Sequence, residues 1–302
     1  MMNTAVIPTI ASQQEDRHVE SRPTDSVLSV EDLWVLNGQN DAIVKGISFE
    51  VPQGSTLGIV GESGSGKTIL LKSVLGVLPP HFKVASGRID LLGTDVLGLN
   101  DKSWRPLRGK GISAIFQDPG SYLNPSIPVG KQLAEVLRIR GKFSRRAAKR
   151  EAISIFDRLY LRSPELVYHQ YPFELSGGML QRVLMAIALC LEPEVLIADE
   201  ATTALDVTVQ AELLDLLKDL KTTLGLSLVL VSHDLAVITQ TADYVLVIRD
   251  GEVIEEGPTE QVLHFPKAPY TQLLVNEHAQ YGLDKFLVPA SSPLSQLEEV
   301  HA

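Results

Sequence analysis

The stretch Gly61-Glu62-Ser63-Gly64-Ser65-Gly66-Lys67-Thr68 carries the strongest structural signal in this chain. It matches the pattern G-x-x-x-x-G-K-[ST], in which glycines allow backbone N–H groups to curl around a phosphate. An apolar run at residues 56–60 precedes it, and a helical pattern at residues 66–78 follows it and stops at two prolines. Strand, glycine-rich turn and helix in this order predict a nucleotide-binding loop.

Lys67 and Thr68 have defined roles in a loop of this kind. Lys67 is predicted to contact the β- and γ-phosphates, and Thr68 is predicted to ligate Mg²⁺. A glycine- and serine-rich loop with a chance lysine is the alternative, and the flanking strand and helix argue against it. On its own, the motif indicates only a nucleotide.

Strand and helix patterns alternate along the rest of the chain and predict an α/β protein with a buried, mainly parallel sheet. The expected strands are 27–36, 43–51, 56–60, 195–199 and 226–232, with a hairpin formed by 244–248 and 252–255. The expected helices are 66–78, 129–140, 145–160, 178–191 and 207–224. The predicted division is a flexible tail at 1–26, a nucleotide-binding domain at 27–258 with a helical insertion at about 121–180, and a partly disordered extension at 259–302.

Composition excludes several classes of function. The 302 residues carry a formal charge of −10, which argues against a general nucleic-acid binder, because phosphate neutralisation needs clustered Lys and Arg. The single cysteine, Cys190, excludes an internal disulfide and a cysteine-rich metal site, and its apolar surroundings indicate a small packed residue. The chain has no apolar run of about 18 to 20 residues, the length that spans a bilayer, and the first 25 residues do not resemble a signal peptide.

Two carboxylates, Asp199 and Glu200, come at the end of the apolar run that begins at residue 195. Ligands bind at the carboxyl ends of the strands in open α/β sheets. Asp199 is therefore predicted to hold Mg²⁺, directly or through water, and Glu200 to polarise the attacking water as general base. An exposed acidic strand end is the alternative, but it does not explain why the pair follows a phosphate loop in the same sheet.

A second glycine-rich turn, Leu175-Ser176-Gly177-Gly178-Met179, lies directly before an apolar helix. The hydroxyl of Ser176 and the backbone N–H groups of the glycines predict another anion site at a helix N-terminus. An ordinary serine cap is the alternative reading of these residues. A single nucleotide site has no use for a second phosphate-binding turn, so this turn indicates a protein that works in pairs.

The order of a phosphate loop, a Leu-Ser-Gly-Gly turn and a strand that ends in Asp-Glu resembles the ATP-binding subunits of ABC transporters, over about residues 27–275. The resemblance implies a P-loop ATPase core with an N-terminal antiparallel β subdomain and an inserted helical subdomain. It implies that two subunits stack head to tail and that residues 175–179 of each contact the ATP held by the other. It also implies that Gln117 senses Mg²⁺ and the attacking water, that His233 contacts the γ-phosphate and that Asp206 lies in a loop crossing the dimer interface.

Finer similarities concern the importer ATPases for oligopeptides, dipeptides and nickel. They are carried by Phe116-Gln117-Asp118-Pro119, Leu123-Asn124-Pro125 and the stretch at 266–271. The resemblance implies two membrane permease subunits, a second ATP-binding subunit that is identical or a paralogue, an extracytoplasmic solute-binding protein, and a place on the cytoplasmic face of the plasma membrane. Many peptide members have a cysteine in a C-terminal tail. This chain has none after Cys190, which favours nickel, a metallophore or another small solute over peptides.

Two positions depart from the family pattern, and two other classes of function are alternatives. The family usually places an aromatic residue on adenine where this chain has Asn37, and Trp34 lies on the other strand face by alternation. Ala201 stands where proline is common. A soluble ABC ATPase of DNA repair or translation usually has coiled-coil arms or two cassettes, which this chain lacks. A P-loop kinase or GTPase leaves residues 175–179 unexplained.

Overall fold

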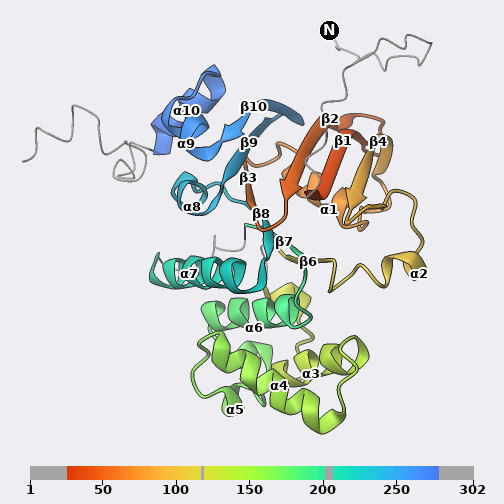
Figure 1. Ribbon diagram of the computed structural model, residues 1–302, viewed down its shortest axis with the longest axis vertical. Helices are drawn as coiled ribbons and strands as arrows, with labels where there is room; N and C mark the ends of the chain where they lie inside the picture. Colours follow the sequence, from red (N-terminus) through yellow and green to blue (C-terminus); the bar gives the residue numbers. More distant parts are fainter. Residues whose placement is uncertain (1–25, 117–118, 201–206, 279–302) are drawn as a thin grey trace, which may run out of the picture.

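The structure is a computed structural model that describes residues 26–116, 119–200 and 207–278. Within these ranges the chain forms two β-sheets with helices around them, and one group of helices lies at one end of the molecule (Figure 1). Gln117 and Asp206 lie outside the described residues. None of the described helices is long and apolar enough to cross a membrane.

The first sheet is antiparallel and has the strand order β2-β1-β4-β5. Its strands are β1 (Ser26–Leu36), β2 (Ala42–Pro52), β4 (Lys83–Leu91) and β5 (Thr94–Asp95). The second sheet has the order β10-β9-β3-β8-β7-β6, and its neighbouring strands run parallel except for β10 at one edge. Its strands are β3 (Thr56–Val60), β6 (Ile112–Ile115), β7 (Val195–Asp199), β8 (Ser227–Val231), β9 (Tyr244–Arg249) and β10 (Glu252–Pro258).

The helices follow the chain in this order: α1 (Lys67–Val74), α2 (Asp101–Trp104), α3 (Val129–Ile139), α4 (Arg145–Arg158), α5 (Pro164–Val167), α6 (Gly177–Leu189), α7 (Val207–Leu224), α8 (Leu235–Thr241), α9 (Thr259–His264) and α10 (Pro269–His278). Two short 3₁₀ helices cover Pro119–Tyr122 and Pro172–Glu174. In Figure 1, α3 to α6 form a helical group at the end of the molecule opposite the antiparallel sheet.

The parallel sheet is apolar on both faces, which is why its central strands are continuous apolar runs and do not alternate with polar residues. Every residue of β3, β7 and β8 is buried. In β7, Val195 and Ile197 pack toward the antiparallel sheet and α1, whereas Leu196 and Ala198 pack toward the helical group. The two faces of this one sheet therefore join the two halves of the molecule.

Before residue 117, the structure differs from the sequence expectations in the end of one helix and in several elements that were not predicted. Helix α1 ends at Val74, earlier than residue 78, because Gly76 takes a left-handed φ of 63° and the N–H groups of Gly76 and Val77 bond back to the carbonyls of Ser73 and Lys72. Strands β4, β5 and β6 and the short helix α2 were not predicted. Strand β4 is exposed along most of its length, so it carries little apolar alternation, and β6 has only four residues.

Candidate functional site

The loop between β3 and α1 is shaped by three glycines with positive φ: Gly61, Gly64 and Gly66, at 152°, 86° and 100°. A Cβ on Gly61 would lie 2.1 Å from the Ile248 carbonyl oxygen, and one on Gly66 would lie 2.7 Å from that of Ile43. Nothing lies within 4 Å of the same position on Gly64. The loop therefore packs tightly against β9 and β2 on one side and is open at Gly64, as a phosphate cradle must be.

Lys67 places its ammonium group inside this loop. The side chain is buried, and Nζ donates hydrogen bonds to the carbonyl oxygens of Gly61 and Glu62, both at 2.7 Å, and to the Ser65 hydroxyl at 3.2 Å. Burial lowers the pKa of Lys67, and the nearby carboxylates, Glu200 first among them, oppose that shift. A cation buried within a loop of backbone dipoles suits a chain of phosphates.

Thr68 and Asp199 meet across the sheet. Thr68 Oγ1 donates a hydrogen bond of 3.0 Å to Asp199 Oδ2, so the first turn of α1 touches the end of β7. Asp199 is 4% exposed, and burial raises its pKa against the effect of the Thr68 hydrogen bond. A hydroxyl and a buried carboxylate are oxygen donors of the kind that Mg²⁺ prefers, so this pair fits that ion.

Glu200 follows β7 in an unusual backbone conformation. Its φ is 49°, in the left-handed region that costs a non-glycine residue about 1 to 3 kcal/mol. Its N–H donates to the Val231 carbonyl at 2.9 Å, which ties the residue to the end of β8. Its Oε2 lies 3.7 Å from Nδ1 of His233. The adjacent ends of β7 and β8 thus bring together two of the predicted catalytic side chains.

The second glycine-rich turn lies at the start of α6. Ser176 is the N-cap of this helix, and its Oγ accepts a hydrogen bond of 3.3 Å from the Met179 N–H. Ser176 and Gly177 are exposed, and nothing lies within 4 Å of where a Cβ on Gly177 would be. Leu175 is buried and anchors the turn. The N-terminus of α6 therefore presents its hydroxyl and glycine backbone to the outside of this subunit.

The chain matches the family model described as ABC transporter over residues 44–203. The chain belongs to the ABC transporter family. The dipeptide transport ATP-binding protein DppD of Bacillus subtilis is 44% identical over 264 residues, which cover 86% of this chain and 79% of that protein. The metal-staphylopine import system ATP-binding protein CntD of Staphylococcus aureus is 38% identical over 260 residues, 84% of this chain and 94% of the relative.

A solved ABC transporter component has the same fold. The structure of cbiO1 from Clostridium perfringens, part of the transporter complex cbiONQ, superposes with a TM-score of 0.71 at 25% identity and covers 91% of this chain and 100% of its own. These comparisons confirm the predicted family, the α/β ATPase cassette and the ATPase activity. The chain is the ATP-binding, ATP-hydrolysing type of ABC subunit.

Not every predicted residue of this ABC ATPase can be placed. Gln117 and Asp206 lie outside the described residues, so their roles stay predictions.

Asn37, at the expected adenine position, uses its side chain to stabilise a turn. Its Oδ1 accepts hydrogen bonds from the N–H groups of Gln39 and Asp41, and its Nδ2 donates one to the Asp41 carboxylate at 3.0 Å. These bonds explain why a polar residue occupies this position.

Sequence reasoning missed two supports behind the phosphate loop of this ABC ATPase. Gly251, in the turn between β9 and β10, donates its N–H to the Ser65 carbonyl at 3.0 Å. Tyr270, in α10, accepts a hydrogen bond of 3.1 Å from the Glu62 N–H. Tyr270 stood within a stretch that indicated kinship with the importers. Nothing in its spacing signalled a contact with the loop.

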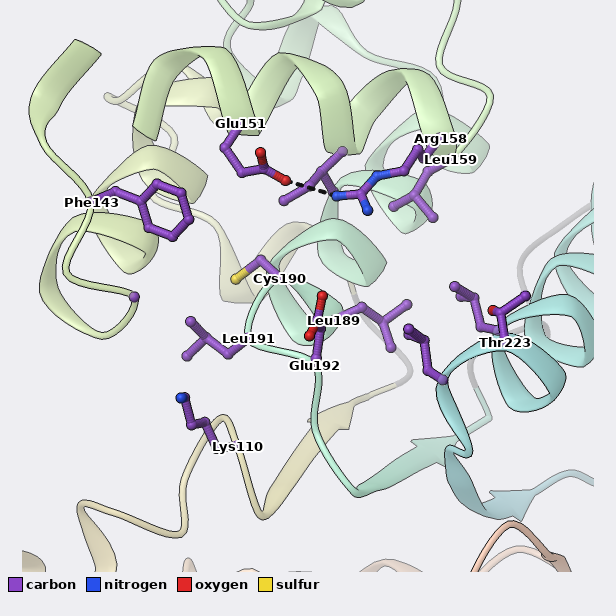
Figure 2. A pocket seen from close by; sticks show the side chains of 14 residues that line it. Lys110, Phe143, Glu151, Arg158, Leu159, Leu189, Cys190, Leu191, Glu192 and Thr223 are labelled. Carbon is purple, nitrogen blue, oxygen red and sulfur yellow. Dashed lines mark hydrogen bonds and ion pairs between the residues drawn. The ribbon is translucent and has the colours of Figure 1, made fainter. Parts of the chain in front are cut away.

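A separate cavity of about 490 Å³ lies between α4, the end of α6 and the end of α7 (Figure 2). Its walls are mainly apolar, and an ion pair of 2.9 Å joins Glu151 and Arg158 beside it. Cys190 lines the cavity and donates its thiol hydrogen to the Ile187 carbonyl at 3.1 Å. Burial raises the pKa of the Cys190 thiol to about 12, so the ABC ATPase holds this cysteine in its unreactive form.

Proposed function

We propose that this ABC ATPase binds ATP with Mg²⁺ on the loop at residues 61–68 and uses its hydrolysis to drive a membrane importer. One observation supports the assignment of the nucleotide site. The ends of β3, β7 and β8 lie at one edge of the sheet, and they bring together the buried Lys67, the Thr68–Asp199 pair and the Glu200–His233 pair. Ligands bind at this edge in α/β proteins.

Each side chain then has a role that its surroundings support. Lys67 and the backbone N–H groups of the loop bind and orient the β- and γ-phosphates. Thr68 and Asp199 hold Mg²⁺, which when bound neutralises phosphate charge. Glu200 accepts a proton from the attacking water, while Gln117 and His233 complete the set around the water and the γ-phosphate. The strained backbone of Glu200 is the kind of outlier that clusters at active sites.

The exposed turn at the start of α6 serves a second subunit. Ser176 and Gly178 contact the ATP held by the partner, with Leu175, Gly177 and Met179 shaping the turn. Support comes from the exposure of Ser176 at the N-terminus of a helix of 13 residues. Asp206 lies in the loop that crosses the interface. Two copies, or this chain and a paralogue, then form two ATP sites.

The roles named for the relatives support import of a small solute. DppD acts in dipeptide transport and CntD in metal-staphylopine import, so we propose a peptide or a metal chelate as the cargo. The system contains two membrane permease subunits, a second ATP-binding subunit and an extracytoplasmic solute-binding protein. The ATPase lies on the cytoplasmic face of the membrane and is attached through the permeases.

The change Glu200→Gln tests the catalytic assignment. We expect ATP binding to persist and hydrolysis to fall at least about 100-fold, because a general base typically contributes 10²- to 10⁴-fold. The variant is also expected to accumulate as an ATP-dependent dimer in sedimentation experiments. Isothermal titration measures the binding, and phosphate release measures the turnover.

Glu192→Gln is the matched control. Glu192 is also a glutamate with a left-handed backbone, with a φ of 52°, but it lines the separate cavity and not the nucleotide site. Its replacement should leave turnover unchanged. Normal turnover in Glu200→Gln would remove Glu200 from the role of base, and failure of that variant to dimerise with ATP would favour a kinase or GTPase over a paired transporter ATPase.

A further inference from the structure

One peptide unit of the phosphate loop is held from both ends. The carbonyl oxygen of Gly61 accepts a hydrogen bond from Lys67 Nζ at 2.7 Å. The N–H of the same peptide unit, which belongs to Glu62, donates to the Tyr270 hydroxyl at 3.1 Å. Tyr270 is 208 residues downstream in the sequence. A single peptide plane therefore connects the lysine of the loop with helix α10.

The Tyr270 hydroxyl is held in place by its own surroundings. The side chain is only 5% exposed, and the Arg249 guanidinium lies 4.7 Å from the ring centroid, in cation–π contact. The segment that leads into α10 is tied to β10, because the Glu255 carboxylate accepts hydrogen bonds from the N–H groups of Lys267 and Ala268 at 2.8 and 2.9 Å. The hydroxyl is thus a fixed acceptor.

The orientation of this peptide matters for the loop. Gly61 has a φ of 152°, and its backbone packs against the end of β9, where the Ile248 carbonyl leaves no room for a Cβ. Without the tyrosine hydroxyl, the Glu62 N–H, which is part-buried, loses the acceptor that the structure gives it, and the peptide is then free to rotate. Rotation would carry the Gly61 carbonyl away from Lys67.

We propose that Tyr270 is a positioning residue for the nucleotide site: its hydroxyl sets the 61–62 peptide and, through it, the Lys67 ammonium. Helix α10, in the C-terminal extension, then contributes to the ATP site and affects the affinity for nucleotide. This inference rests on the proposed use of residues 61–68 as the phosphate loop.

The change Tyr270→Phe tests the proposal, because it keeps the ring beneath Arg249 and removes only the hydroxyl. In the full-length chain we expect the Kd for ATP and the KM for ATP to rise about 3- to 10-fold, which is about 0.7 to 1.4 kcal/mol and is the size of one hydrogen bond. The kcat should stay within about twofold, since the groups that act on water are untouched. Titration with a fluorescent ATP analogue and steady-state phosphate release supply these values.

Tyr244→Phe is the matched control. Tyr244 lies at the start of β9, and its replacement removes a hydroxyl away from the loop, so its KM for ATP should equal that of the unaltered protein. If Tyr270→Phe changes only the midpoint of urea unfolding and leaves Kd and KM as they were, the hydroxyl is merely structural and the proposal is wrong.

Lys67→Ala separates this proposal from the one on which it rests. If Lys67→Ala abolishes ATP binding while Tyr270→Phe binds normally, the loop is the ATP site and only the role of Tyr270 fails. If Lys67→Ala binds ATP as the unaltered protein does, the assignment of the loop fails as well. Weakened binding in both variants supports both statements.

Discussion

At the scale of single residues, the site depends on side chains that burial has placed in unusual states. Lys67 is a buried cation whose pKa burial lowers, and it is satisfied by two carbonyl oxygens of its own loop. Glu200 has a left-handed backbone, and a hydrogen bond from its N–H to Val231 ties it to the end of β8. Both states cost free energy, and the packing and hydrogen bonds around the two residues offset that cost.

Cys190 gives the pH dependence that is simplest to measure, because it is the single cysteine of the chain. Burial raises its pKa from 9.0 to about 12, which lowers the thiolate fraction near pH 8 about a thousandfold. A thiolate of higher pKa is also more nucleophilic, which offsets part of the loss in labelling rate. We therefore expect labelling of Cys190 to be at least about 30-fold slower than labelling of an exposed thiol.

The rate of Cys190 labelling should rise about tenfold per pH unit from pH 7 to 9, without the plateau that an ordinary cysteine begins to show near its pKa. A maleimide or disulfide reagent followed by mass spectrometry measures the rate. The same chain in 6 M guanidinium, about the concentration that unfolds most domains, is the control and should react at the ordinary rate. Fast labelling of the folded protein would mean that the thiol is not held as described.

At the scale of elements, strong patterns were predicted well and weak ones were not. The strand at 195–199 coincides with β7, because a strand buried on both faces is a continuous apolar run that no turn residue interrupts. Strand β4 was not predicted, because most of its residues are exposed and show no apolar alternation. Its place in the sheet depends on pairing with β1, which is distant in the sequence and leaves no local signal. The Trp104 ring that packs against Gly76 comes from 28 residues further along the chain and left no local pattern.

Arg182 connects three helices and allows a stability prediction. It lies on α6, its side chain is 8% exposed, and it donates one hydrogen bond to the Leu159 carbonyl at the end of α4 and another to Glu212 on α7. Arg182→Met should lower the free energy of unfolding by about 2 kcal/mol, the usual value of a hydrogen bond made by a charged group to a buried partner. Urea denaturation measures the change.

Glu212→Gln is the control for Arg182. The Glu212 side chain is 58% exposed and keeps its water, so its replacement should cost no more than about 1 kcal/mol. Equal losses in the two variants would show that the ion pair, and not the bond to Leu159, carries the stabilisation.

At the scale of the whole molecule, the parallel sheet connects two regions with different tasks. One face packs against the antiparallel sheet and α1, and the other packs toward α6 to α8, with α3 and α4 packed in turn on α6. A change at the nucleotide edge therefore reaches both regions through the same strands. Packed cores of this kind move between discrete arrangements, which suits a cycle of ATP-driven closure and opening.

Purification from native membranes in mild detergent tests the transport proposal at this scale. We expect two permease subunits and a second ATPase to accompany the chain, with an extracytoplasmic binding protein in the same system, all identified by mass spectrometry. A ligand bound to that protein names the solute and decides between peptide and metal chelate. Recovery with ribosomal or DNA-associated proteins alone would overturn the transport reading and leave the ATPase in place.

The sequence by itself identified the family and the ATPase activity, because the residues that signal them stand in short contiguous motifs. Glycines, lysine and threonine in one loop, and two carboxylates after one strand, predict ATP and Mg²⁺ without any knowledge of distant contacts. Only the tertiary structure decided how the loop is supported and which strands pair in the antiparallel sheet. The contact between Tyr270 and Glu62 spans 208 residues, and a contact between distant residues leaves no periodic pattern in a single sequence.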